Sequence, residues 1–130
     1  MTKNRDIMLK IGDFPVVPYN IILKEALEEM SKYNLGVACF LDKKNNLKGI
    51  ITDGDIRRKL LLDQKPFSAF FVDDSIKHAV KKPKSSSPDK NIKETLKMMN
   101  KNEIWDVPII EKKKLVGLVH LHPAMKKLIK

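Results

Sequence analysis

The sequence contains one segment twice. Residues 24–60 read KEALEEMSKYNLGVACFLDKKNNLKGIITDGDIRRKL, and residues 93–128 read KETLKMMNKNEIWDVPIIEKKKLVGLVHLHPAMKKL. Glu25 and Glu94 lie 69 positions apart, and beyond a one-residue deletion in the turn Gly49 and Gly117 lie 68 apart. Because self-similarity at a fixed spacing marks a repeated structural unit, the sequence predicts one small unit that is built twice.

Each copy has the same order of expected elements. A proline-containing lead-in, FPVVP or SSSP, comes before a helix whose apolar residues recur at i, i+3, i+4 and i+7, which in the first copy are Leu23, Ala26, Leu27 and Met30. A short apolar strand follows at residues 37–41 or 107–110, then a polar turn, a second strand and a short final helix. Strands without polar alternation are covered on both faces. The pattern therefore predicts an α/β (α+β) fold made of two β-α-β-β-α units.

The expected domains are residues 1–65 for the first unit and 66–130 for the second. Between the repeats, Asp74 or Ser75 is a candidate N-cap for a short helix that ends near Val80. His78 is expected on the exposed surface of that helix. The lysine- and serine-rich residues that follow are expected to form a loop.

Composition narrows the class of protein. With 42% hydrophobic and 32% charged residues, the chain has the make-up of a soluble globular protein. The single cysteine, Cys39, cannot form an internal disulfide, which favours a reducing cytoplasm. No stretch approaches the roughly 18 consecutive apolar residues of a membrane span, and the N-terminus lacks the apolar core of a secretory signal. No membrane partner is expected.

The formal net charge of +10 raises nucleic acid as a partner. However, the lysines are scattered through turns and tails, and the aromatic residues, 6% of the chain, are not interleaved with them. A stacking platform for bases needs that interleaving. Nucleic-acid binding is therefore not the favoured function.

The polar stretch of the first repeat, GIITDGDIRRKL at residues 49–60, has several possible roles. A calcium loop is disfavoured because Arg57 stands where the fifth position needs an oxygen ligand. A catalytic carboxylate pair, Asp53 and Asp55, is disfavoured because the neighbouring arginines favour the ionised state of both. A simple helix cap by Thr52 or Asp53 would by itself explain the residues. Phosphate binding at the start of the following helix is the remaining role.

Two tandem β-α-β-β-α units resemble a pair of CBS domains, which would pack with pseudo-two-fold symmetry. The first repeat also fits that family's nucleotide signature, Gly-h-h-Thr/Ser-x-x-Asp (h is an apolar residue), at residues 49–55. The resemblance implies a non-catalytic regulatory module that binds a nucleotide of the AMP or ATP type, or a CMP-sugar, and requires no cofactor or metal. It also implies association into homo-oligomers through the helices.

The same resemblance assigns roles to residues. Thr52 is implied to contact the phosphate and Asp55 the ribose, within a stretch that also holds Asp53 and Gly54. Arg57 or Arg58 would offset the charge of Asp53 and steer the anion. The base would lie against four apolar residues, Val17, Pro18, Val37 and Ala38.

A narrower resemblance is to the C-terminal CBS pair of arabinose-5-phosphate isomerases of the lipopolysaccharide and capsule (Kdo) pathway. Its pattern is met by Arg5-Asp6-Ile7-Met8, Leu35-Gly36, the stretch from Thr52 to Arg58, and His120-Leu121-His122. If the chain is a fragment, an isomerase domain is the implied partner. A CBS pair of a sugar nucleotidyltransferase and a ligand-independent oligomerisation module are the alternatives.

The second repeat departs from the nucleotide signature, because His120 and Pro123 replace Thr52 and Asp55. Its cleft is expected either to have lost adenosine-type binding or to bind a different ligand through Ser85, Ser86, Ser87, His120 and His122. A metal site is not favoured. His120 and His122 would share one face of a strand, but no third ligand is evident.

Overall fold

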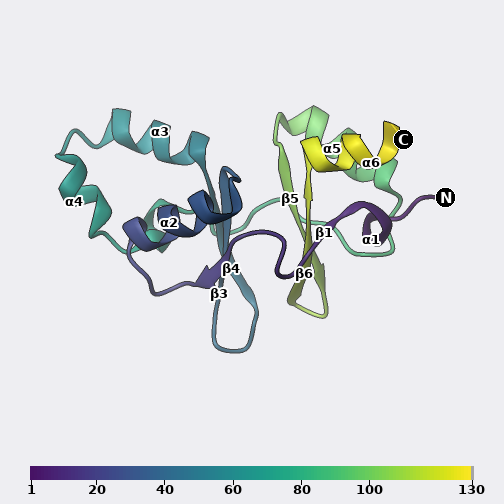
Figure 1. The fold of residues 1–130 in the computed structure, drawn as a ribbon, viewed down its shortest axis with the longest axis horizontal. Helices are drawn as coiled ribbons and strands as arrows, with labels where there is room; N and C mark the ends of the chain where they lie inside the picture. The colour runs from purple at the N-terminus through teal and green to yellow at the C-terminus, as the bar shows by residue number, and fades with distance from the viewer. Residues whose placement is uncertain (130) are drawn as a thin grey trace. The chain divides into compact units, whose positions relative to one another are not determined.

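A computed structural model describes residues 1–129 and divides the chain into two compact units (Figure 1). The contiguous unit is Phe14–Lys82, and the discontinuous unit joins Met1–Asp13 to Pro83–Lys130. The predicted boundary near residue 65 follows the sequence repeat, whereas packing groups the first 13 residues with the second repeat.

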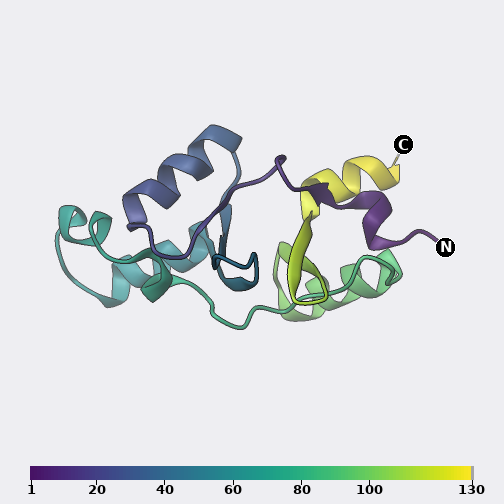
Figure 2. The same ribbon diagram turned by 90° about the horizontal axis from the view of Figure 1, so that it is seen from below.

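The contiguous unit has the predicted order of elements. Its elements are β2 (Val16–Pro18), α2 (Leu23–Tyr33), β3 (Val37–Leu41), β4 (Leu47–Thr52), α3 (Asp53–Leu62), α4 (Phe67–Phe71) and the 3₁₀ helix η1 (Ser75–His78). The sheet order is β2-β3-β4, with β2 parallel and β4 antiparallel to β3. Figures 1 and 2 show α2 and α3 on the same side of this sheet. The predicted β-α-β-β-α unit is confirmed here.

Helix α2 forms as its periodicity predicts. Leu23, Ala26 and Met30 are buried against the sheet residues Phe40 and Ile51. The helix ends where Asn34 adopts a left-handed conformation (φ 53°), which asparagine tolerates better than most residues. Burial of each large apolar side chain contributes about 1.5–3 kcal/mol to folding, so this stripe anchors the helix.

The discontinuous unit repeats the arrangement with other residues. Its elements are α1 (Asn4–Ile7), β1 (Leu9–Lys10), α5 (Ile92–Asn102), β5 (Asp106–Glu111), β6 (Lys114–His120) and α6 (Leu121–Ile129). The sheet order is β1-β6-β5, and both views place α5 and α6 on one side of it. Ser86 forms a parallel bridge to Ile109, as Val17 does to Phe40, so the 69-residue spacing holds in three dimensions.

Each unit is completed by a short segment that lies before the lead-in of the other repeat, here called the exchanged segment. Leu9 pairs with Leu118 in the discontinuous unit, and Val80 pairs with Ile50 in the contiguous unit. The repeated glycine makes this close approach possible: a Cβ on Gly117 would lie 2.8 Å from the Leu9 carbonyl oxygen, and one on Gly49 would lie 3.1 Å from the Val80 carbonyl oxygen. The glycine of the signature therefore allows the exchanged segment to pack against the strand.

The expected short helix between the repeats is present as η1, with Asp74 at its N-cap position, although the Asp74 side chain makes no capping hydrogen bond and Ser75 lies inside the helix. The expectation that His78 is exposed was wrong. His78 is buried, with 7% of its surface exposed, because its ring packs against Phe70 and its Nε2 lies 3.0 Å from Asp73 Oδ2. The charged residues next to His78 in the sequence suggested an exposed position, but they do not determine the burial of its side chain.

Candidate functional site

The predicted phosphate and ribose residues meet at the junction of β4 and α3. Thr52 ends the strand and caps the helix: its Oγ1 accepts a hydrogen bond from the Asp55 backbone N–H at 3.3 Å. In return, Asp55 Oδ2 accepts from the Thr52 backbone N–H at 3.0 Å and from its hydroxyl at 3.1 Å. This is a capping box. The helix-cap interpretation is therefore realised in full, and any ligand role must be added to it.

The other oxygen of Asp55 faces an arginine. Arg58 Nη2 donates to Asp55 Oδ1 at 2.8 Å, across one helical turn. The Asp55 side chain is only 15% exposed, whereas that of Arg58 is 58% exposed. Both carboxylate oxygens of Asp55 are thus hydrogen-bonded, and Oδ1 is bonded to a largely exposed side chain.

The remaining residues of the signature lie around this cluster. The Asp53 carboxylate lies over Gly36, where a Cβ would come within 2.3 Å of its Oδ2, and the Asp53 N–H donates to the Gly36 carbonyl at 3.0 Å. Gly54 lies beneath the Arg58 guanidinium, and Arg57 is exposed on α3. Thr52, Asp55 and Arg58 therefore form one network, while Asp53 is turned towards the β3 side.

The residues predicted to contact a base differ in accessibility. Val37 and Ala38 have no exposed surface, Val17 is 5% exposed, and Pro18 is exposed. Contact of a base with Val37 and Ala38 stays a prediction. Neither side chain is exposed in the structure, so a base could reach them only after a rearrangement.

A groove of about 430 Å³ runs between β2 and α2. Its lining residues are Val16, Val17, Pro18, Ile21, Glu25, Glu28, Glu29 and Lys32. Lys32 is paired with Glu29 at 2.9 Å, which raises the pKa of Lys32 and leaves the groove acidic. An anionic group is therefore expected at the start of α3 rather than in this groove.

The matching position of the second repeat holds a different pair. His120 pairs with Asp106 across β5 and β6, as Thr52 pairs with Val37 across β3 and β4. His120 Nδ1 is hydrogen-bonded to Asp106 Oδ1, and this contact raises the pKa of His120 above its ordinary value, against the opposing effect of burial. Sequence reasoning missed Asp106, although a carboxylate opposite His120 in the hairpin register was the available signal.

The other candidates of the second repeat are not gathered around His120. His122 lies in the exposed first turn of α6, which begins at Leu121, so the expectation that the two histidines share a strand face was wrong. Ser85 is exposed in the loop. Among residues 1–129, no group of three His, Cys, Asp or Glu side chains is arranged to hold a metal ion.

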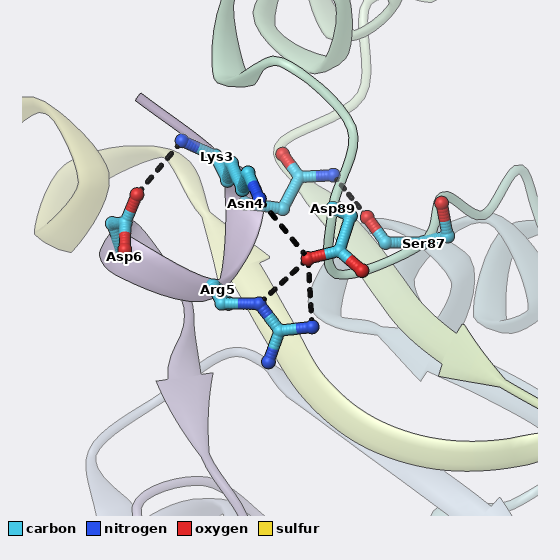
Figure 3. Close-up of polar contacts among 6 residues, drawn as sticks. All are labelled: Lys3, Asn4, Arg5, Asp6, Ser87 and Asp89. Carbon is cyan, nitrogen blue, oxygen red and sulfur yellow. Dashed lines mark hydrogen bonds and ion pairs between the residues drawn. The ribbon is translucent and has the colours of Figure 1, made fainter. Parts of the chain in front are cut away.

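Ser86 and Ser87 instead anchor the N-terminal segment, and Figure 3 shows the contact between Asn4 and Ser87. The side-chain amide of Asn4 donates to Ser86 Oγ at 3.0 Å and to the Ser87 carbonyl at 2.8 Å. Thr95 Oγ1 donates to Asn4 Oδ1 at 2.7 Å, which satisfies an amide that is fully buried. A ligand role for the two serines stays a prediction beside this structural one.

Exposed ion pairs of Lys3 and Arg5 with Asp89 lie beside the Asn4–Ser87 contact (Figure 3). Arg5 Nε donates to Asp89 Oδ1 at 2.8 Å, and Lys3 Nζ lies 3.7 Å from the same oxygen. The Arg5 hydrogen bond lowers the pKa of Asp89. No functional role was predicted for this cluster, and its position shows that it holds residues 3–6 against the loop before α5.

A second polar cluster that sequence reasoning missed lies beside α4. Asp73 Oδ2 accepts from Lys65 Nζ at 2.6 Å and contacts His78, and the Lys65 hydrogen bond is the main reason why the pKa of Asp73 is lowered. Lys65 also lies 4.9 Å from the centre of the Phe70 ring. The cluster ties the α3–α4 connection to η1.

Comparison with known proteins identifies the scaffold. The CBS domain family matches residues 5–62 and 64–122. The chain belongs to the CBS domain family. None of the helices in residues 1–129 has the length and apolar character needed to cross a membrane.

Several curated proteins resemble this CBS pair. It is 30% identical over 127 residues to uncharacterized protein RP505 of Rickettsia prowazekii, covering 96% of this chain and 37% of that protein. It is 30% identical over 122 residues to YlbB of Bacillus subtilis, covering 93% of this chain and 78% of that one. It is 27% identical to arabinose 5-phosphate isomerase KdsD of Yersinia pestis, covering 93% of this chain and 36% of the isomerase. The chain thus spans little more than a third of the length of RP505 and of KdsD.

Solved structures show the same fold. CBSX2, crystallised in complex with AMP, superposes with a TM-score of 0.85 at 16% identity, covering 99% of this chain and 97% of that one. The CBS domain pair of protein MJ0100, in complex with 5′-methylthioadenosine and S-adenosyl-L-methionine, gives a TM-score of 0.79 at 23% identity, covering 99% and 96%. These likenesses establish the CBS-pair architecture.

Proposed function

We propose that this CBS pair is a non-catalytic regulatory module that binds a nucleotide, or a nucleotide-sugar, through its first repeat. The observation that carries the proposal is that Thr52 and Asp55 stand together at the start of α3, within a chain of the CBS family. Two CBS pairs of the same fold were crystallised with adenosine-containing ligands, which supports the class of ligand.

In the proposed complex, the ligand uses groups that the cap leaves available. The Thr52 hydroxyl already donates to Asp55, so a phosphate would accept this hydrogen bond in place of the carboxylate and would lie at the positive end of the α3 dipole. The ribose hydroxyls would donate to Asp55 Oδ1, the carboxylate oxygen that Thr52 does not use, in place of the Arg58 guanidinium. The base would lie beside β2, at Pro18 and Val17.

Thermal unfolding in the presence of AMP, ATP, CMP, a CMP-sugar and S-adenosylmethionine tests the proposal. A ligand at 100 times its dissociation constant adds about 2.7 kcal/mol to the free energy of unfolding. Asp55→Asn should remove most of this gain, whereas the matched control Asp63→Asn, at the exposed end of the same helix, should keep it. No stabilisation by any ligand, or equal stabilisation of the Asp55→Asn variant, would reject nucleotide binding at this site.

The parent protein that we propose is an arabinose-5-phosphate isomerase of lipopolysaccharide or capsule synthesis, in the cytoplasm. Support comes from the likeness to KdsD and from the fraction of that protein which the chain spans. The CBS pair of a sugar nucleotidyltransferase is the alternative. Preferential binding of a cytidine-linked sugar would favour the isomerase pathway, and preferential binding of AMP or ATP would count against it.

A ligand-independent role in oligomer formation is the second candidate function. The end of α3 and the short helix α4 with its C-cap expose five large apolar side chains within twelve residues, namely Leu61, Leu62, Phe67, Phe71 and Val72. We propose that a second copy of the chain covers this surface. Sedimentation of the wild type should show an oligomer that Leu62→Glu dissociates and that Ile11→Glu, a control at an isolated exposed residue, leaves intact. A monomeric wild type would reject this role.

A further inference from the structure

The guanidinium of Arg58 occupies the acceptor that a ribose would use. Asp55 Oδ2 is bonded to the N–H and the hydroxyl of Thr52, so Oδ1 is the carboxylate oxygen that the cap does not use. Arg58 Nη2 lies 2.8 Å from this Oδ1. A ribose that bonds to Oδ1 therefore competes with the arginine.

Two further contacts define the position of the guanidinium. A Cβ on Gly54 would lie 3.2 Å from Arg58 Nη1 and 3.3 Å from Nη2, so the group extends over the first turn of α3. Its side chain is nevertheless 58% exposed. Exposed ion pairs between residues of one helix are weak, so the Arg58–Asp55 contact is one that a ligand can open.

Opening this contact has different consequences for different ligands. A neutral nucleoside displaces the guanidinium from Asp55 and gives it no new anionic partner. A ligand with a phosphate displaces it equally and offers oxygens that match the guanidinium in charge and geometry. A conformational change favours a ligand only to the extent that the ligand interacts differently with the two states.

We propose that Arg58 makes the site selective for anionic ligands: it closes Asp55 in the free protein and moves to the phosphate when a nucleotide binds. The inference rests on the proposed nucleotide site and specifies its ligand class. Arg57 is the contrasting residue, since it is also exposed on α3 and the structure gives it no contact with Asp55. In the second repeat the arrangement is absent, because Pro123 replaces Asp55 and Lys126 replaces Arg58.

Isothermal titration with AMP, adenosine, CMP and cytidine tests the inference, using the wild type, Arg58→Ala, Arg57→Ala and Asp55→Asn. For Arg58→Ala we expect about threefold tighter binding of the nucleoside, because a weak competing ion pair is removed. We expect at least about tenfold weaker binding of the nucleotide, because a charge-assisted hydrogen bond is lost. The preference for the nucleotide should thus fall about thirtyfold, while Arg57→Ala leaves it nearly unchanged.

The outcomes separate the two levels of the argument. Wild-type protein that binds none of the four ligands would overturn this inference, and it would overturn the proposed function as well if the five ligands of the thermal-unfolding test also gave no stabilisation. Binding that Asp55→Asn abolishes, with a nucleotide preference that Arg58→Ala does not change, would overturn the inference alone. Equal loss of preference in Arg57→Ala and Arg58→Ala would also overturn it, because general electrostatic attraction would then suffice. Thermal unfolding of each variant verifies that the compared proteins are folded.

Discussion

The two units carry polar side chains at different places on the same scaffold. In the discontinuous unit, the interior holds Ser86 and Thr95, joined through the buried amide of Asn4. The corresponding interior positions of the contiguous unit, 69 residues earlier, are Val17 and Ala26, both buried and apolar. One backbone arrangement is thus stabilised by hydrogen bonds in one unit and by apolar packing in the other.

At the start of the last helix the difference has another form. Thr52 is hydrogen-bonded to Asp55, in the helix that it caps, whereas His120 is hydrogen-bonded to Asp106, on the neighbouring strand. The first arrangement leaves a hydroxyl and a carboxylate oxygen near solvent. The second uses the carboxylate to hold an imidazole. Matched scaffolds therefore do not imply matched ligands, and each site has to be argued from its own residues.

The largest expected effect concerns the interior. Asn4→Ala should lower the free energy of unfolding by about 2–4 kcal/mol, because it opens a cavity and removes the 2.7 Å hydrogen bond of the buried Thr95 hydroxyl and the 2.8 Å hydrogen bond to the Ser87 carbonyl. The matched variant Ser75→Ala should change it by less than about 1 kcal/mol, because Ser75 Oγ has no hydrogen-bond partner in the described structure. Denaturant titration measures both. Equal losses would show that the two interiors are stabilised alike.

The next effect concerns the glycine against which each exchanged segment packs. Gly117→Ala should cost about 1–3 kcal/mol, because the new Cβ would lie 2.8 Å from the Leu9 carbonyl oxygen and 2.4 Å from Met8 Sδ. Gly49→Ala should cost less, since its nearest neighbour is 3.1 Å away. Thermal unfolding of the two variants side by side gives the order, and a larger cost for Gly49→Ala would contradict it.

A smaller effect is expected at the helix cap. Thr52→Ala should destabilise the protein by about 1 kcal/mol, because the Asp55 N–H loses its acceptor, while Thr52→Ser should be nearly neutral. His120→Ala, at the corresponding residue, removes instead the hydrogen bond to Asp106 across the strands. Circular dichroism during denaturation would detect the loss, and a Thr52→Ala variant as stable as the wild type would show that the cap is not needed.

The smallest effect is the pH dependence of His120. Asp106 raises the pKa of His120, so the native state holds this proton more tightly than the unfolded state does. The resulting stability is fully present below the unfolded histidine pKa of about 6.5 and is lost as the pH rises through the folded pKa. Asp106→Asn should flatten this part of the stability profile, and the exposed control His122→Asn should keep it. A profile that Asp106→Asn does not alter would assign the dependence to other groups.

Sequence reasoning predicted those elements whose signal is local. The stripe from Leu23 to Met30 and the apolar run at residues 37–41 are short-range patterns, and the structure confirms both the helix and the strand. Local sequence patterns could not predict that the N-terminal segment packs with the second repeat, because Asn4 and Thr95 lie 91 positions apart and no periodicity connects them. His78 was misjudged for the same reason, since its burial depends on Phe70 and Asp73 rather than on its neighbours in the sequence.

The candidate site was predicted in part. Its residues were found from the 49–60 stretch, and the structure adds that Thr52 and Asp55 are bonded to one another and that Arg58 rather than Arg57 contacts Asp55. Adjacent arginines on a helix point in different directions, and only the three-residue spacing brings Arg58 over Asp55. Their binding roles stay predictions for the titrations above.

The exchanged segments also have a consequence for folding: we expect the contiguous unit to fold before the discontinuous one. The contiguous unit, residues 14–82, can close its sheet over short loops, since Val80 reaches back only to Ile50. The discontinuous unit needs Leu9 to find Leu118, a separation that makes loop closure slower and entropically more costly. We therefore expect that, during synthesis, residues 1–13 pair only after β6 has emerged, whereas all residues of the proposed nucleotide site lie in the unit that can fold earlier.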